Sequence, residues 1–217
     1  GSEMCIRDRY RRKTIVINGG LLRDAVISAA HSISNKKKSV DELNVFPVPD
    51  GDTGTNMSMT ITNSVAELEN LSDDTDCSVV ASTTASALLR GARGNSGVIL
   101  SLIFRGFAKG LAGKKEMGAN ELVESLEQGV SGAYKSVMKP TEGTILTVAR
   151  ESAEKAREML HSTNDPIIIM EEVCKQAELS LNETPKLLPA LAKAGVVDAG
   201  GKGLLIILSL IHISEPT

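Results

Sequence analysis

Two aspartates on either side of a glycine, Asp50 and Asp52, form the pattern in this chain that most clearly suggests chemistry. Two carboxylates this close together repel each other unless a cation lies between them. Hard oxygen ligands beside small, flexible residues suit Mg²⁺. The residues directly after the pair, namely Thr53, Gly54, Thr55 and Asn56, begin an expected helix, whose free N–H groups can bind an anion. The segment therefore predicts a site for a magnesium nucleotide.

Calcium-binding EF-hand loops and aspartyl phosphatase motifs also begin with closely spaced aspartates. An EF-hand loop starting at the first aspartate would need an oxygen ligand, a glycine and a glutamate where this chain has Gly54, Thr55 and Ile61. The phosphatase motif would need a preceding strand, which Pro47 and Pro49 disfavour. A capped turn with two solvated aspartates stays open as the alternative to a metal site.

A second loop, from Arg90 to Gly97, has three glycines and enters an expected helix. Glycines let the backbone approach a phosphate closely, so this loop predicts phosphate contacts from Gly94, Asn95, Ser96 and Gly97. Arg90 and Arg93 could neutralise the negative charge of a phosphate there. The loop lacks the Gly-Lys-[Ser/Thr] of a P-loop and the strand of a dinucleotide fold. A plain helix–loop–helix turn is the alternative.

Two further loops interrupt the helical pattern, from Lys139 to Thr144 and from Gly195 to Gly203. Helix capping alone would explain each of them, with Thr144 opening a helix and glycine ending one. Four such loops in one helical domain make sense if one end of a bundle binds one ligand.

The elements that must position these loops are helices. Apolar residues at helical spacing predict helices over about 21–38, 56–71, 77–89, 96–111, 120–138, 144–160, 165–181 and 184–195. Asn120 and Asp165 are the expected N-caps of two of them. The run from Leu204 to Leu208 is too short to assign, and the prolines between Val45 and Pro49 indicate a loop. About eight helices and no convincing sheet predict an all-α bundle.

Composition excludes some classes of partner. Aromatic residues make up 2% of the chain, there is no tryptophan, and the net charge is −3, so a nucleic-acid surface is not expected. The apolar run from Gly203 to Ile213 is too short to span a bilayer. Three cysteines without metal-like spacing predict a reduced, cytoplasmic setting.

We expect a single domain over residues 11–208. Residues 1–10 begin with Gly-Ser, which is typical of a tag scar, and continue without helical or strand periodicity. Residues 209–217 are equally out of character. Both ends are therefore expected to be artefacts of cloning or sequence assembly, and a helix cut near Leu208 would expose apolar surface and permit a homodimer.

The segment Asp50–Met57 resembles the metal–nucleotide loop of the ATP-binding L subunit of dihydroxyacetone kinase. Longer segments resemble the N-terminal domain of the A subunit of bacterial fatty acid kinase, namely Leu43–Met57, Gly91–Phe107, Lys139–Ala149 and Gly195–Leu205. The resemblance extends from about Ile17 to Leu208. It implies an antiparallel eight-helix barrel that binds ATP and two Mg²⁺ ions at one end.

The resemblance also implies roles for individual residues. Asp50 and Asp52 would bind metal, and Asn44 would be the third ligand, because the dihydroxyacetone kinase pattern has a third aspartate where this chain has Val45. The residues from Thr53 to Asn56, with Asn95 and Ser96, would contact phosphates. Thr144, Asp198 and Gly200 would lie near the sugar and base.

The function that the resemblance implies is transfer of the γ-phosphoryl group to a fatty-acid carboxylate. Arg93 is the catalytic candidate for countering transition-state charge, because it is near the second loop's glycines in the sequence. A separate carrier protein, the B subunit, would present the fatty acid, and further domains would follow this one in the full-length kinase. A carboxylate is already ionised near neutral pH, so no general base is needed, which suits motifs without a nearby histidine. The alternatives are a nucleotide-binding regulatory module without turnover of its own and a subunit of a dihydroxyacetone-type (glycerone) kinase.

Overall fold

The computed structural model describes residues 15–211, with side chains through residue 209. Its helices are α2 (Gly19–Asp41), α3 (Thr53–Thr62), α4 (Val65–Glu69), α5 (Cys77–Gly91), α6 (Gly94–Gly110), α7 (Ala119–Ser136), α8 (Ile145–Met159), α9 (Pro166–Leu187), α10 (Pro189–Ala194) and α11 (Ala199–Ile211). Within 15–211 there is no strand, only an isolated antiparallel bridge between Ile17 and Met117. Because α4 and α10 have only five and six residues, eight longer helices remain, and the predicted all-α bundle is confirmed.

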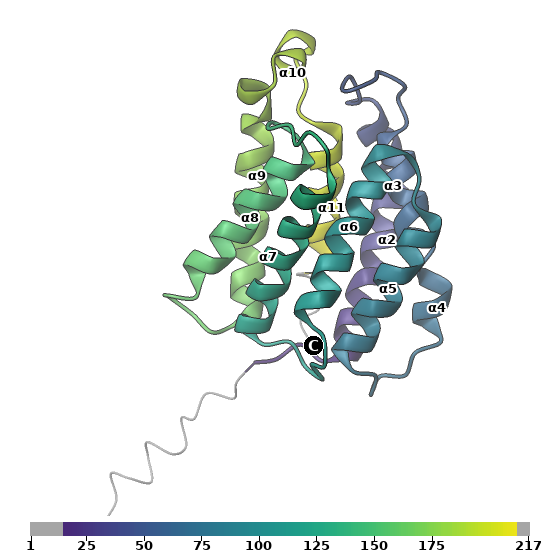
Figure 1. Ribbon diagram of the computed structural model, residues 1–217, viewed down its shortest axis with the longest axis vertical. Coiled ribbons are helices and arrows are strands. Elements are labelled where there is room, and N and C mark those ends of the chain that lie inside the picture. The colour runs from purple at the N-terminus through teal and green to yellow at the C-terminus, as the bar shows by residue number, and fades with distance from the viewer. Residues whose placement is uncertain (1–14, 212–217) are drawn as a thin grey trace, which may run out of the picture.

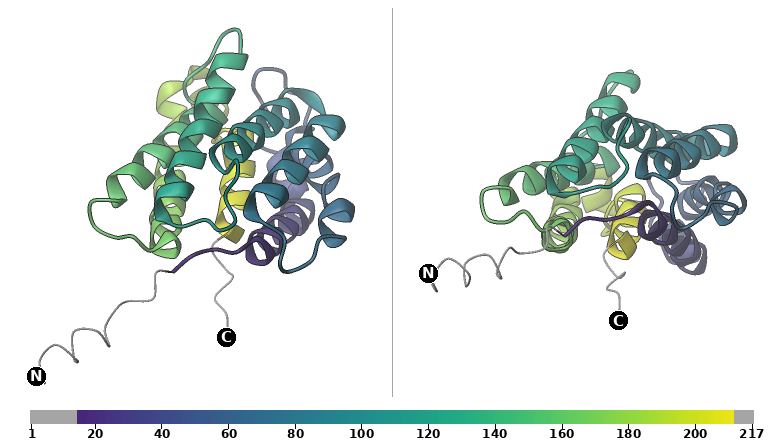
Figure 2. Two further views of the ribbon diagram at one scale, coloured as in Figure 1. Left: turned by 60° about the horizontal axis from the view of Figure 1, so that its bottom comes forward. Right: turned by 90° about the horizontal axis from the view of Figure 1, so that it is seen from below.

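The longer helices lie side by side along the long axis of the molecule (Figure 1). Helix α2 contacts α5, α5 contacts α6, and the contacts continue in chain order through α7, α8 and α9. Helix α11 packs against α2 and also against α8 and α9, so it lies between the first and last parts of the bundle (Figure 2). These contacts form a closed ring of helices.

Apolar residues at helical spacing make the core, as α2 illustrates. Leu22, Val26, Ala29 and Ile33 recur every three or four residues, and each is at most 3% exposed. This spacing puts them on one face of the helix. In the part of the chain that the structure describes, no helix is both long and apolar enough to cross a membrane.

Glycines allow α6 and α7 to approach very closely. A Cβ added to Gly106 would lie 2.2 Å from the carbonyl oxygen of Gln128, and one added to Gly110 would lie 2.5 Å from the Cα of Ser125. Gly110 follows Gly106 in α6, but its contact Ser125 precedes Gln128 in α7, so the two helices are antiparallel. Only residues without a side chain fit at these contacts.

Most of the expected helices are present, but the one predicted over 56–71 is two helices. It breaks at Asn63 and Ser64, between α3 and α4. The Asn63 amide donates to the carbonyl oxygen of Ala87 (2.7 Å), and the Ser64 hydroxyl donates to that of Ile61 (2.7 Å). Short polar side chains of this kind compete with the backbone and interrupt helices.

The predicted helix start at Thr184 and Pro185 is wrong, since α9 continues through Pro185 to Leu187. A proline within a helix leaves the carbonyl oxygen four residues earlier without its N–H donor. Here that oxygen belongs to Leu181, and it accepts a hydrogen bond from the Thr184 hydroxyl (2.6 Å) instead. The next helix begins at Pro189.

Helix caps follow the prediction in two cases and differ in a third. Thr144 and Asp165 are N-caps whose side chains accept backbone bonds, as expected. Asn120 is not an N-cap, because α7 begins after Gly118, whose N–H donates to the Glu121 carboxylate (3.1 Å).

The expected end segments fall largely outside the described residues. Segment 1–10 is wholly outside them, as are residues 212–217 of the expected tail. Helix α11 continues beyond the expected boundary at Leu208 and reaches Ile211.

Candidate functional site

A cavity of about 530 Å³ lies at the end of the bundle where four helices begin. This is the upper end in Figure 1, where the connections α2–α3 and α10–α11 lie. The first residues of α3, α6, α8 and α11 all contribute to its lining, together with the last turn of α7. The N-terminus of a helix carries free N–H groups and a partial positive charge. The first turns of α3 and α6 are therefore suited to an anionic ligand, whereas N–H groups at the starts of α8 and α11 already donate to Thr144 and Asp198.

Most of the predicted site residues meet at this cavity although they come from four separate loops. The predicted residues that line it are Asn44, Asp50, Asp52, Thr53, Asn56, Gly94, Asn95, Ser96, Thr144, Asp198 and Gly200. The predicted residues Gly54, Thr55, Gly97 and Arg93 are not part of the lining.

Two of these four residues are glycines that let helices pack. A Cβ on Gly54 would lie 2.2 Å from the carbonyl oxygen of Lys37 in α2, and one on Gly97 would lie 2.3 Å from Oγ1 of Thr60 in α3. Both glycines therefore place the N-termini of α3 and α6 by close contact with a neighbouring element. Their role in the site is indirect.

Arg93 is the exposed N-cap of α6. Its backbone N–H donates to the Thr60 hydroxyl (3.1 Å). Lys139 is the one cation among the described residues that line the cavity. The structure thus places Lys139 at the cavity, where the sequence had suggested Arg93.

Asp41 is a residue of this region that the sequence patterns missed. Its carboxylate accepts hydrogen bonds from the backbone N–H (2.9 Å) and the hydroxyl (2.7 Å) of Thr55. Both Thr55 groups therefore bind Asp41 at the third position of α3. Asp52, the N-cap of that helix, makes no capping hydrogen bond with its side chain. Because Asp41 lies at the end of a different helix, no local signal in the sequence links it to Thr55.

The acidic part of the cavity favours a bound cation. The buried Asn44 amide donates to Oδ1 of Asp50 (2.6 Å) and so fixes that carboxylate. The pKa of Asp52 is raised, first by its removal from water and then by the neighbouring Asp50 and Asp41 carboxylates, while a hydrogen bond from Asn56 opposes the shift. Negative charge is disfavoured at Asp52 in the absence of a cation, and a cation between the carboxylates would reverse this.

The donor set fits Mg²⁺ bound together with phosphate oxygens. Within the described part of the chain, no group of three or more His, Cys, Asp or Glu side chains could hold a metal ion. Mg²⁺ is usually held by one or two carboxylates, with water and phosphate oxygens completing its octahedron. Asp50 and Asp52 can supply the carboxylates, and Asn44, the predicted third ligand, donates its amide N–H to Asp50 and keeps its oxygen available for a metal.

Backbone geometry at the start of α6 depends on a glycine. Gly94 has a φ of 61°, in the left-handed region. A Cβ there would lie 2.5 Å from Nδ2 of Asn56 on α3. Gly94 therefore brings the N-terminal turn of α6, with Asn95 and Ser96, against the α3 side of the cavity.

Asp198 joins the N-termini of α8 and α11. Its carboxylate accepts hydrogen bonds from the backbone N–H of Gly201 (2.8 Å) and from that of Ile145. Its own N–H donates to the Thr184 hydroxyl (3.1 Å). Asp198 is 5% exposed, and its burial raises the pKa to about 6 despite the two N–H donors. The hydrogen bonds of this residue thus hold one wall of the cavity together.

The remaining wall of the cavity is apolar, and the sequence analysis did not anticipate it. Its residues are Phe46, Val48, Val98, Ile99, Leu102, Val137 and Met138. Val48, Val98 and Met138 are exposed, so this wall extends to the rim. The cavity can take a ligand with an anionic, metal-binding part and a flat or apolar part.

Comparison with known proteins gives related sequences that are much longer than this chain. Protein YloV of Bacillus subtilis is 50% identical over 191 residues, which cover 88% of this chain and 34% of YloV. Uncharacterized protein SH1689 of Staphylococcus haemolyticus is 51% identical over 191 residues, again covering 88% of this chain and 34% of the relative. The chain thus spans about a third of the length of these relatives.

Solved structures with a similar fold include dihydroxyacetone kinase from C. freundii in complex with AMP-PNP and Mg²⁺. It matches with a TM-score of 0.68 and 16% identity, over 95% of this chain and 36% of the kinase chain. The native form of that kinase matches with a TM-score of 0.62. The model of the DAK2 domain matches residues 47–212. The chain therefore belongs to the DAK2 domain family.

Proposed function

We propose that this chain binds Mg-ATP in the cavity and serves as the ATP-binding domain of a kinase. The observation that carries the proposal is the meeting of the N-termini of α3 and α6 with the Asp50–Asp52 pair around one cavity. Helix N-termini favour phosphate, and the carboxylates favour its metal ion. The fold likeness to a kinase solved with AMP-PNP and Mg²⁺ supports the same assignment.

Each wall of the cavity has a role in this proposal. Asp50 and Asp52 hold Mg²⁺, as two ions in the complex with ATP, and Asn44 orients the first carboxylate. The residues that contact phosphate are Thr53, Asn56, Gly94, Asn95 and Ser96. Thr144, Asp198 and Gly200 lie nearer the sugar and base, and the apolar wall covers the base. Magnesium supplies neutralisation of charge on the β- and γ-phosphates.

A carboxylate is the acceptor that the described lining suits best. A hydroxyl acceptor would usually need a general base. No histidine lines the cavity within the described residues, Asp50 and Asp52 are assigned to Mg²⁺, and Asp198 is held by two backbone N–H donors, so no carboxylate or histidine of the described lining is left for that task. A fatty-acid carboxylate is ionised already. We therefore propose that a carrier protein presents a fatty acid, which accepts the γ-phosphoryl group to give an acyl phosphate. Lys139, rather than Arg93, is the lining cation that can counter charge during transfer.

Two alternatives have specific support. A dihydroxyacetone-type kinase subunit is favoured by the fold likeness. A binding module without turnover is compatible with the match to the DAK2 domain, which names no activity. Domains outside this chain, a carrier protein or a second copy would then complete the activity.

Nucleotide binding can be tested by thermal unfolding with AMP-PNP, with and without Mg²⁺. A ligand that binds only the folded state stabilises it by about 2.7 kcal/mol at a hundred times its Kd. We expect a Mg²⁺-dependent rise in Tm for the wild type and none for the double variant Asp50→Ala, Asp52→Ala. The matched control is Asp73→Ala with Asp74→Ala, which removes two exposed aspartates outside the cavity. Equal stabilisation of both double variants would refute the proposed site.

The acceptor is tested separately, with ATP and either a fatty-acid carrier protein or dihydroxyacetone. Formation of an acyl phosphate would support the proposed acceptor. Phosphorylation of dihydroxyacetone alone would favour the first alternative. Tight Mg-nucleotide binding with neither product would favour the binding module.

A further inference from the structure

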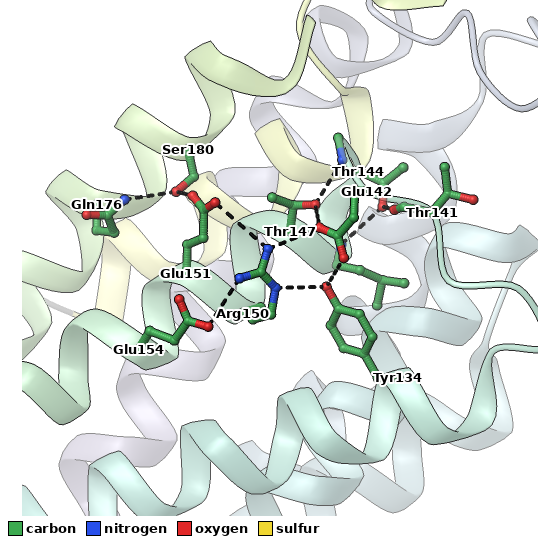
Figure 3. A network of polar contacts seen from close by, with 12 residues as sticks. Tyr134, Thr141, Glu142, Thr144, Thr147, Arg150, Glu151, Glu154, Gln176 and Ser180 are labelled. Carbon is green, nitrogen blue, oxygen red and sulfur yellow. Dashed lines mark hydrogen bonds and ion pairs between the residues drawn. The ribbon is translucent and has the colours of Figure 1, made fainter. Parts of the chain in front are cut away.

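We propose that Arg150 is a positioning residue that, through Glu142, holds the loop over residues 141–144 against the cavity. This inference rests on the proposed nucleotide site and assigns a function to a polar network outside the cavity (Figure 3). Arg150 lies on α8, at the groove between α7 and α8, and does not line the cavity.

Arg150 brings three acidic side chains and a tyrosine together. Its Nη2 lies 3.2 Å from Oε2 of Glu142, its Nη1 lies 3.1 Å from Oε1 of Glu154, and its Nε donates to the hydroxyl of Tyr134 at 3.4 Å. Glu151 lies farther away, with 3.9 Å between Nη2 and Oε1. Of these partners, Glu142 alone belongs to the loop before α8.

Glu142 is tied to both α7 and α8. Its Oε1 accepts from the Tyr134 hydroxyl (3.0 Å) and its Oε2 accepts from the Thr147 hydroxyl (2.5 Å). Burial would raise the pKa of Glu142, but the hydrogen bonds from Thr147, Arg150 and Tyr134 outweigh burial and lower it. Glu142 is therefore held as a carboxylate by groups on two helices.

The same network fixes the backbone of the loop. The buried Gly143 N–H donates to Oγ1 of Thr147 (2.8 Å), the atom that also donates to Glu142. Gly143 has a φ of 83°, and a Cβ there would lie 2.8 Å from the Cβ of Leu188. The loop is thus held from the α8 side by hydrogen bonds and from the α9 side by close packing.

The residues on either side of this tie line the cavity. Thr141 and Thr144 belong to its wall, and the Thr144 hydroxyl donates to the carbonyl oxygen of Thr141 (2.7 Å). A shift of Glu142 and Gly143 must move both threonines, because they are adjacent in the chain. Arg150 therefore controls the wall that we assign to the sugar and base.

If the ion pair of Arg150 and Glu142 served only to stabilise the fold, loss of Arg150 would lower global stability without a specific effect on the loop. The Arg150 and Glu142 side chains are 37% and 47% exposed, and ion pairs so exposed contribute little to folding stability. Loss of Arg150 should thus affect the loop and the nucleotide more than it affects global unfolding.

The test compares Arg150→Met with Arg157→Met. Arg157 is the matched control, because it also lies on α8 and pairs with Glu127 of α7 through two hydrogen bonds of 2.6 Å, but it is farther from the loop. Calorimetry should show Kd for Mg-AMP-PNP raised about two- to fivefold in Arg150→Met, the scale of one partly exposed ion pair. Arg157→Met should bind as the wild type does, and Arg150→Lys should recover part of the loss.

Amide hydrogen exchange in the ligand-free protein provides a readout that needs no nucleotide. The Gly143 N–H should exchange faster in Arg150→Met than in Arg157→Met. Equal exchange in these variants, or equal nucleotide affinity, would overturn the proposal. If the wild type binds no Mg-nucleotide, the proposed function fails, while the exchange rates still decide whether Arg150 orders the loop.

Discussion

Replacing Asp198 by asparagine should change how stability depends on pH. Asp198 is 5% exposed, and burial raises its pKa to about 6 from 3.8, against the opposing effect of N–H donors from Gly201 and Ile145. Asparagine keeps an oxygen that can accept the Gly201 bond, but it has no charge to titrate. The variant therefore retains a cap and removes the buried ionisation.

The size and sign of the effect follow from the pKa difference. About 2 pKa units separate the folded and unfolded values, which corresponds to about 3 kcal/mol. Because the folded protein holds this proton more tightly, the stability that Asp198 contributes is complete below about pH 4 and is lost as the pH rises through about 6. A helix N-terminus favours a carboxylate by only about 0.3–1 kcal/mol, so burial should dominate.

The assay is urea unfolding of the wild type and Asp198→Asn at several pH values. The stability of the variant relative to the wild type should increase by about 3 kcal/mol between about pH 4 and pH 8. Asp165→Asn, which replaces the capping carboxylate of α9, controls for the exchange of a cap oxygen at a less buried position. A difference that stays constant with pH, or that falls as the pH rises, would refute the argument from burial.

Two further predictions concern helix packing and the metal site. Gly106→Ala should destabilise the protein by about 1–3 kcal/mol in urea unfolding, because the added Cβ would lie 2.2 Å from the Gln128 carbonyl oxygen. The control is Gly132→Ala, whose added Cβ would have its nearest atom at 3.7 Å and which should be neutral or stabilising. Equal effects would contradict the close α6–α7 contact. Asn44→Ala removes the hydrogen-bond donor to Asp50. It should weaken Mg²⁺-dependent AMP-PNP binding about tenfold in calorimetry, without a comparable loss when Mg²⁺ is absent. An unchanged Mg²⁺ dependence would count against an orienting role for Asn44.

Local patterns in the sequence were sufficient for the fold class and for most helices. Apolar residues at helical spacing predicted α2, α5, α6, α7 and α8 to within a few residues. Such patterns work because each helix buries one face. They failed at Pro185, where the Thr184 hydroxyl satisfies the carbonyl oxygen that the proline leaves free. A residue that normally ends a helix is tolerated there because of a neighbour's hydrogen bond.

Some residues of the candidate site could likewise be predicted from local motifs, and others could not. Motifs within single loops indicated Asp50, Asp52 and Asn95, because metal and phosphate sites need these residue types at short spacing. The exposed position of Arg93 outside the cavity could not be read from its nearness to Gly94 in the chain.

The sequence by itself determined that the chain is helical and that four loops carry polar and glycine residues at helix starts. Only the tertiary structure decided that these loops meet at one cavity, that Asp41 binds Thr55, and that Arg150 reaches Glu142. The physical reason is that helix formation depends on neighbours three or four residues apart. The meeting of distant loops depends instead on how whole helices pack, and contacts such as that of Gly106 with Gln128 set that packing.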